Sequence, residues 1–179
     1  MMKSKVIALS AISAAFISIF LTLGAYIEFF DLIAVLIASI FVLMPLYLGS
    51  YLGCVLSYLA GTLLAFLFSG FNIYSVVFPL FLLFFGIFPI VKCIVMQKNL
   101  NRYAFIVLGL LWSIASAFGT YFFYILIFGQ EVLAGLPDFI VNNVYFFVVG
   151  AGVVFYFLFD KFVFMSRVVI NRYLSKIIK

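Results

Sequence analysis

The sequence VIALSAISAAFISIFLTLGA, residues 6–25, decides the class of fold. It has no charged residue, and a helix of about 20 such residues crosses the hydrocarbon of a bilayer. Five further apolar runs follow, at residues 32–48, 51–68, 74–96, 104–128 and 140–165. None of them shows the strict alternation of apolar and polar residues that is typical of a membrane barrel. The sequence therefore predicts an all-α, polytopic transmembrane bundle of six helices, forming one domain over residues 1–179.

The composition supports a lipid environment and excludes several classes of protein. Charged residues make up 8% of the chain, whereas a soluble protein needs about a quarter. The net charge of +5 comes from residues that flank the apolar runs, so we expect membrane lipid and no nucleic acid as a partner. The chain has no His, and Cys54 and Cys93 lie inside apolar runs as expected for small core residues. We therefore predict no metal site and no cofactor.

The charged residues predict the orientation, because Lys and Arg stay on the cytoplasmic side. With six spans and the N-terminus inside, all ten basic residues fall on that side: Lys3, Lys5, Lys92, Lys98, Arg102, Lys161, Arg167, Arg172, Lys176 and Lys179. Four of the five acids fall outside: Glu28, Asp31, Glu131 and Asp138. We expect Lys92 and Lys161 to extend to the inner surface, and Lys161 to neutralise Asp160. The prediction is a multi-pass protein of the bacterial cytoplasmic membrane with both termini inside.

Three segments have two interpretations each. MMKSK followed by an apolar run is similar to a signal peptide, but the run is long and has no clear cleavage site, so we expect the first span to be retained. The basic cytoplasmic tail, residues 166–179, is either an interfacial helix at the inner leaflet or a frayed continuation of the sixth helix. Pro79, Gly86 and Pro89 interrupt the fourth span, which predicts a bend that either lines a transport site or only serves packing.

One side of the first span contains only small residues. Steps of three and four from Ser4 reach Ala8, Ala11, Ala15, Ser18, Thr22 and Ala25, all on one face of a helix. In lipid, such a face favours close approach of another backbone. The third span has a small series of its own, at Gly53, Ser57, Gly61 and Ala65. The face therefore packs either within this chain's own bundle or against another protein.

The motif Ala11-x-x-x-Ala15, in AISAA, resembles the first-helix motif of the S components of energy-coupling factor (ECF) vitamin transporters. The resemblance extends to the length and the six-helix topology with both termini inside. It implies a membrane subunit that binds a vitamin or another micronutrient for uptake. It also implies docking through Ala8, Ala11, Ala15 and Ser18 onto a T component that is linked to two ABC ATPases. The substrate would be a small molecule held near the outer surface.

Polar residues at the outer ends of the spans are the candidates for ligand binding, since polar groups within lipid are costly and tend to be paired or functional. They are Glu28, Asp31, Asn72, Tyr121, Tyr124, Gln130, Asn142 and Asn143. We expect the two adjacent amides, Asn142 and Asn143, to lie just inside the sixth span and to need partners. The alternative is that the tyrosines form an interfacial belt and the acids are merely solvated.

The remaining motifs argue against an enzyme. A nucleotide-binding G-x-x-x-x-G-K-[S/T] loop is missing, so energy for transport would come from a partner. Intramembrane proteases need His, and headgroup transferases need clustered cytoplasmic aspartates, of which only Asp160 is present. The alternative function is a non-transporting small membrane protein of envelope, assembly or sporulation.

Overall fold

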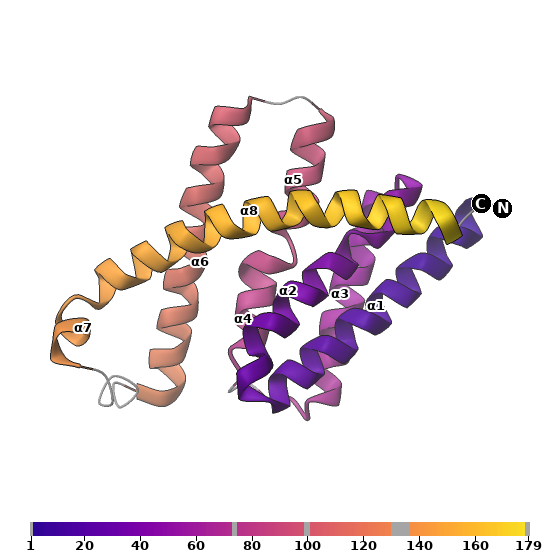
Figure 1. Cartoon of the computed structure of the whole chain (residues 1–179). Helices are drawn as coiled ribbons and strands as arrows, with labels where there is room; N and C mark the ends of the chain where they lie inside the picture. Colours follow the sequence, from indigo (N-terminus) through magenta and orange to yellow (C-terminus); the bar gives the residue numbers. More distant parts are fainter. Residues whose placement is uncertain (1, 73–74, 99–100, 130–136, 178–179) are drawn as a thin grey trace.

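The computed structural model describes residues 2–72, 75–98, 101–129 and 137–177, and within those ranges it contains helices and no strand. Six stretches of these described residues are long and apolar enough to cross a membrane: Lys3–Tyr26, Asp31–Leu48, Tyr51–Phe68, Val77–Gln97, Tyr103–Phe128 and Val144–Ser175. The all-α, six-span prediction is confirmed, and the chain is a multi-pass membrane protein. The first and last described residues lie at the same end of the molecule (Figure 1), as an even number of spans requires.

Helices α1 (Met2–Tyr26), α2 (Asp31–Val42) and α3 (Tyr51–Phe68) form the first part of the bundle. The short turn η1 (Glu28–Phe30) joins α1 to α2, and η2 (Met44–Leu48) leads to Gly49, whose left-handed φ of 73° suits glycine. The small series of α3 faces α1, because a Cβ added at Gly61 would lie 2.7 Å from the Ile17 Cβ. These glycines therefore allow the two backbones to approach closely.

The fourth span is broken, as its prolines predict. It consists of α4 (Val77–Leu80), the π-helical turn η3 (Phe81–Phe85) and α5 (Phe88–Gln97). Neighbouring helices bind the carbonyl oxygens of the break: the Tyr58 hydroxyl donates to Leu82 (3.1 Å) and the Trp112 indole to Leu83 (2.9 Å). Protein donors thus replace the hydrogen bonds that the irregular turn loses in lipid. These contacts favour the interpretation of the break as a packing feature.

The last part consists of α6 (Arg102–Phe128), the short α7 (Asp138–Asn142) and α8 (Val144–Ile177). The sixth span begins at Val144, four residues later than predicted, because the chain turns at Asn143 between α7 and α8. Helix α8 continues without interruption through Ile177. Of the two interpretations of the tail, the structure therefore favours continuation of the sixth helix.

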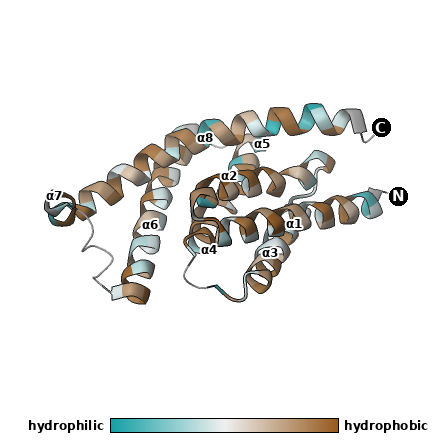
Figure 2. Cartoon of the chain, turned by 60° about the horizontal axis from the view of Figure 1, so that its bottom comes forward, coloured by the Kyte–Doolittle hydropathy of each residue, from teal (hydrophilic) through white to brown (hydrophobic). Residues whose placement is uncertain are grey.

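Helix α8 connects the two parts of the bundle. It runs antiparallel to α6, where Tyr145 packs near Tyr121 and Tyr156 covers Gly109. It then crosses α5 and reaches η2 (Figure 1). Buried aromatic rings fill the space below it: Phe84, Phe85, Phe88, Tyr156 and Phe159. Figure 2 shows hydrophobic colouring over most of the helices and hydrophilic turns in the C-terminal half of α8.

Candidate functional site

No other part of the chain that the structure describes covers the N-terminal half of the row of small residues on α1. Ala8, Ala11 and Ala15 are exposed, and we call these three residues the α1 small face. Helix α3 packs on a different side of α1, next to Ser10, Ala14 and Ile17. The small series of α3 is therefore used for packing within the molecule, whereas the α1 small face is not.

The outer half of this row behaves differently. Ser18 is buried, and its hydroxyl donates to the Ala15 carbonyl oxygen at 2.9 Å. Thr22 and Ala25 are half-buried. Ser18 is thus not part of the exposed face, contrary to the prediction from the sequence, because other parts of the chain cover this side of α1 at Ser18. The α1 small face is confined to the N-terminal half of α1, on the side that the basic residues predict to be cytoplasmic.

The structure brings some of the predicted ligand-binding residues together at the ends of the helices that the basic residues predict to be outside. The Asp31 carboxylate, at the start of α2, interacts electrostatically with the Tyr124 hydroxyl of α6. The rings of Tyr121 and Tyr145 meet edge to face with centroids 6.1 Å apart. The Asn72 amide donates to the Ala25 carbonyl oxygen at 3.4 Å. The side chain of Glu28 and all of Gln130 lie outside the described residues.

The expectation for Asn142 and Asn143 is corrected. Both residues precede the apolar span Val144–Ser175, because Asn142 ends α7 and Asn143 forms the turn before α8, and both are exposed. The Asn143 side chain donates to the Phe139 carbonyl oxygen at 2.9 Å, which holds the turn. Ligand binding by these two residues stays a prediction.

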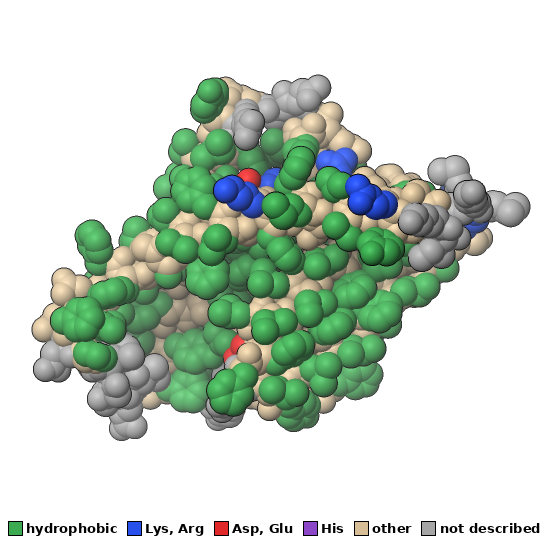
Figure 3. Space-filling view, viewed as in Figure 1, with side chains coloured by type: hydrophobic (Ala, Val, Ile, Leu, Met, Phe, Trp, Pro, Cys, Tyr) green, Lys and Arg blue, Asp and Glu red, His purple; other side chains and the backbone are tan. Residues whose placement is uncertain are grey.

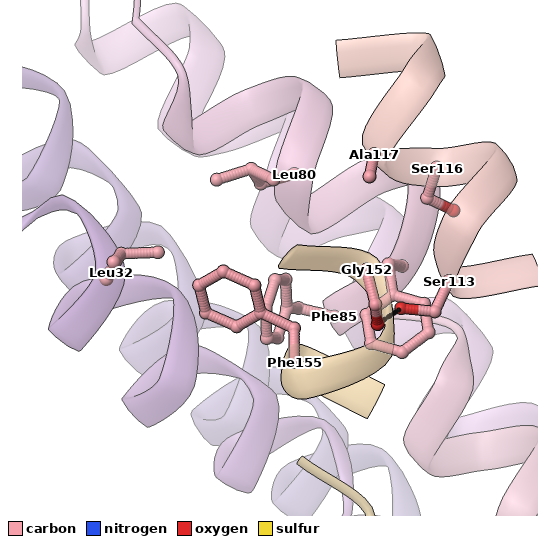
Figure 4. A pocket seen from close by; sticks show the side chains of 9 residues that line it. Leu32, Leu80, Phe85, Ser113, Ser116, Ala117, Gly152 and Phe155 are labelled. Carbon is pink, nitrogen blue, oxygen red and sulfur yellow. Dashed lines mark hydrogen bonds between the residues drawn. The ribbon is translucent and has the colours of Figure 1, made fainter. Parts of the chain in front are cut away.

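A pocket of about 70 Å³ lies between α2, α4, η3, α6 and α8. Leu32, Leu80, Phe85, Ala117 and Phe155 point into it, and Ser113 and Ser116 lie on the α6 side (Figure 4). Both hydroxyls already donate within the protein, Ser113 to the Gly152 carbonyl oxygen and Ser116 to that of Trp112. The pocket is consequently an apolar space. Sequence patterns do not reveal it, because its walls come from five separate elements.

The ion pair predicted at Asp160 has a different partner. Lys92 of α5, 6% exposed, lies with its Nζ 2.6 Å from Asp160 Oδ1, and it also donates to the Asp160 main-chain oxygen. Lys161 is exposed on another side of α8. The expectations that Lys161 neutralises Asp160 and that Lys92 extends to the surface are therefore wrong. A buried ammonium in lipid needs a paired carboxylate, and the fold provides one by laying α8 across α5.

The described residues contain no group of three or more Cys, Asp and Glu that could hold a metal ion. Cys54 and Cys93 are buried thiols of α3 and α5.

Comparison with known proteins gives no further information about the site. No protein-family model matches the chain, and no curated protein or solved structure matches it either. The function is therefore inferred from the residues and their geometry.

Proposed function

We propose that this protein is the membrane-embedded, substrate-binding subunit of an uptake transporter in the bacterial cytoplasmic membrane. It would dock through the α1 small face onto a separate energy-coupling module, comprising a membrane partner and ABC ATPases. The proposed substrate is a vitamin or another micronutrient.

The observation that carries the proposal is the exposure of Ala8, Ala11 and Ala15. Small residues favour close helix contact in lipid, because dispersion between closely packed backbones replaces the missing hydrophobic driving force. Within this chain, α3 makes such a contact with α1 through Gly53 and Gly61, on another side of the helix. The α1 small face is a second surface of small residues and is exposed, so it suits a helix from a partner protein.

The outer ends of α2 and α6 are the proposed place for the substrate. Asp31 and Tyr124 interact there across the two helices, and Tyr121, three residues before Tyr124 on α6, packs its ring against Tyr145 of α8. A carboxylate with several tyrosines suits a ligand that has a planar ring and hydrogen-bonding groups.

A co-purification experiment tests the docking. The tagged full-length chain is purified from its host in mild detergent, and the recovery of ABC ATPases is quantified. Ala11→Trp and Ala15→Trp are each expected to abolish that recovery, because a large ring separates the packed helices. Ala60→Trp is the matched control, since it makes the same change of size at an exposed alanine that lies on α3 instead of α1. Equal ATPase recovery with the parent chain and both alanine variants would refute the proposal.

The alternative, a non-transporting membrane protein, is favoured by one observation. The apolar pocket between α2 and α6 measures about 70 Å³, far below the roughly 300–1,000 Å³ of small-molecule sites. Mass spectrometry of the purified protein, together with thermal shifts across a vitamin panel, discriminates the two functions. A co-purified vitamin or a ligand-induced shift supports the transporter, and the lack of both supports the alternative.

A further inference from the structure

The C-terminal part of α8 is longer than the membrane requires. Helix α8 has 34 residues, which gives a length of about 51 Å, compared with about 30 Å of hydrocarbon. Its first charged residue, Asp160, comes about 24 Å along the helix. The segment from Lys161 onward therefore reaches the inner membrane surface.

This segment has two opposite sides. Val163, Ser166, Ile170 and Leu174 are buried, where α8 crosses η2. The other side contains Lys161, Met165, Val168, Val169 and Arg172, which we call the α8 basic face; all five are exposed. Steps of four, three and four from Lys161 reach Met165, Val168 and Arg172, so these side chains lie in one row along the helix.

The exposed side fits neither water nor hydrocarbon. Phe164, Met165, Val168, Val169 and Tyr173 are each between 49% and 64% exposed, which water would penalise. Lys161 and Arg172 are exposed among them, which hydrocarbon would penalise. Figure 3 shows blue basic side chains along α8 with green apolar ones between them. The boundary between headgroups and acyl chains suits both kinds of side chain.

The positive charge of the segment from Lys161 onward favours anionic lipids. Residues 161–179 include five basic residues and no acidic one. Because Asp160 is paired with Lys92, the Lys161 charge is not neutralised by its neighbour. Lys161 and Arg172 are 11 positions apart, about 16 Å along the helix, so a single phosphate cannot contact both. We propose that the α8 basic face binds a row of anionic phospholipid headgroups in the inner leaflet, with acyl chains against Met165, Val168 and Val169.

Quenching of tryptophan fluorescence by brominated lipids tests this proposal. Trp112 is the only tryptophan of the chain, so Trp112→Phe combined with Val168→Trp gives a single reporter on the α8 basic face. The full-length protein is reconstituted at low salt into phosphatidylcholine vesicles, with brominated phosphatidylglycerol or brominated phosphatidylcholine as quencher. The parent reporter is expected to bind phosphatidylglycerol at least fivefold more tightly than phosphatidylcholine. Each charge contributes up to about fivefold, so adding Lys161→Gln and Arg172→Gln is expected to make the affinities for the two lipids nearly equal.

Two controls distinguish the contribution of the α8 basic face to the lipid preference from that of the chain's overall charge. Lys161→Arg with Arg172→Lys is expected to preserve the preference, because the charges remain. Lys5→Gln with Lys98→Gln removes the same charge from α1 and from the end of α5, and is expected to leave the preference at position 168 unchanged. Equal quenching by the two lipids, or an unchanged preference after neutralising Lys161 and Arg172, would overturn the proposal. Absence of quenching by either lipid would also overturn it, because it would show that position 168 does not contact acyl chains.

Discussion

Lys92 and Asp160 form an ion pair between the broken fourth span and the helix that crosses it, with Nζ and Oδ1 2.6 Å apart. Lys92 is buried, and Asp160 is half-buried at the edge of the same contact. The pair lies just beyond the aromatic cluster of Phe84, Phe88 and Phe159. It therefore fixes where α8 leaves α6 and continues toward η2.

Removing one member of this pair should destabilise the protein strongly. Asp160→Asn leaves the Lys92 charge buried without its counter-ion, and we expect a loss of about 3 kcal/mol in the free energy of unfolding. Lys92→Met with Asp160→Leu removes both charges, and should recover most of that loss. Unfolding in mixed micelles, followed by circular dichroism, measures both variants. A double variant as unstable as Asp160→Asn would contradict the pairing.

Close packing of α1 on α3 predicts a sharp difference between two neighbouring positions. A Cβ at Gly61 would lie 3.0 Å from the Ala14 carbonyl oxygen as well as against Ile17, so Gly61→Val should cost about 1–3 kcal/mol. Ala60 is exposed, and Ala60→Val should change stability by less than about 0.5 kcal/mol. The same unfolding assay compares them. Equal effects at the two positions would show that α3 packs on α1 through another side.

The donors at the break in the fourth span should each contribute modestly to stability. Tyr58→Phe removes the hydrogen bond to the Leu82 carbonyl oxygen and should cost about 0.6 kcal/mol. Trp112→Phe should cost a similar amount, because Ser116 also donates to Leu83, at 3.2 Å. Thermal unfolding of each variant checks this prediction. No loss in either variant would mean that these carbonyls find other donors.

Much of the fold is predictable from the sequence because lipid imposes a simple requirement. A chain in hydrocarbon must satisfy its backbone groups internally, so each long apolar run becomes a helix. Pro79 and Pro89 likewise predict the break, since proline lacks an N–H and clashes with the preceding turn. The start of the sixth span is less predictable, because Asp138–Asn142 forms a separate helical turn before Asn143.

The candidate sites are less predictable because they depend on how helices cross. Asp160 has a neighbouring Lys161 in sequence, yet its partner is Lys92, 68 positions away. The row of small residues on α1 is visible in the sequence, but only the packing of the neighbouring helices decides that Ala11 is exposed while Ser18 is buried. Interactions of this kind arise from the route of α8 and the register of α3, which hydropathy does not encode.

Thiol labelling in native membranes shows whether another protein covers the α1 small face, on which the proposed function depends. In a Cys54→Ala, Cys93→Ala background, Ala8→Cys places a small thiol on this face, near Lys5 and the predicted inner surface. Leu52→Cys is the control, because Leu52 is exposed at the start of α3. A membrane-permeant maleimide should label the control thiol equally in native membranes and in the purified chain. It should label the thiol at position 8 several-fold more slowly in native membranes than in the purified chain. Equal labelling at position 8 in the two preparations would contradict the proposed docking.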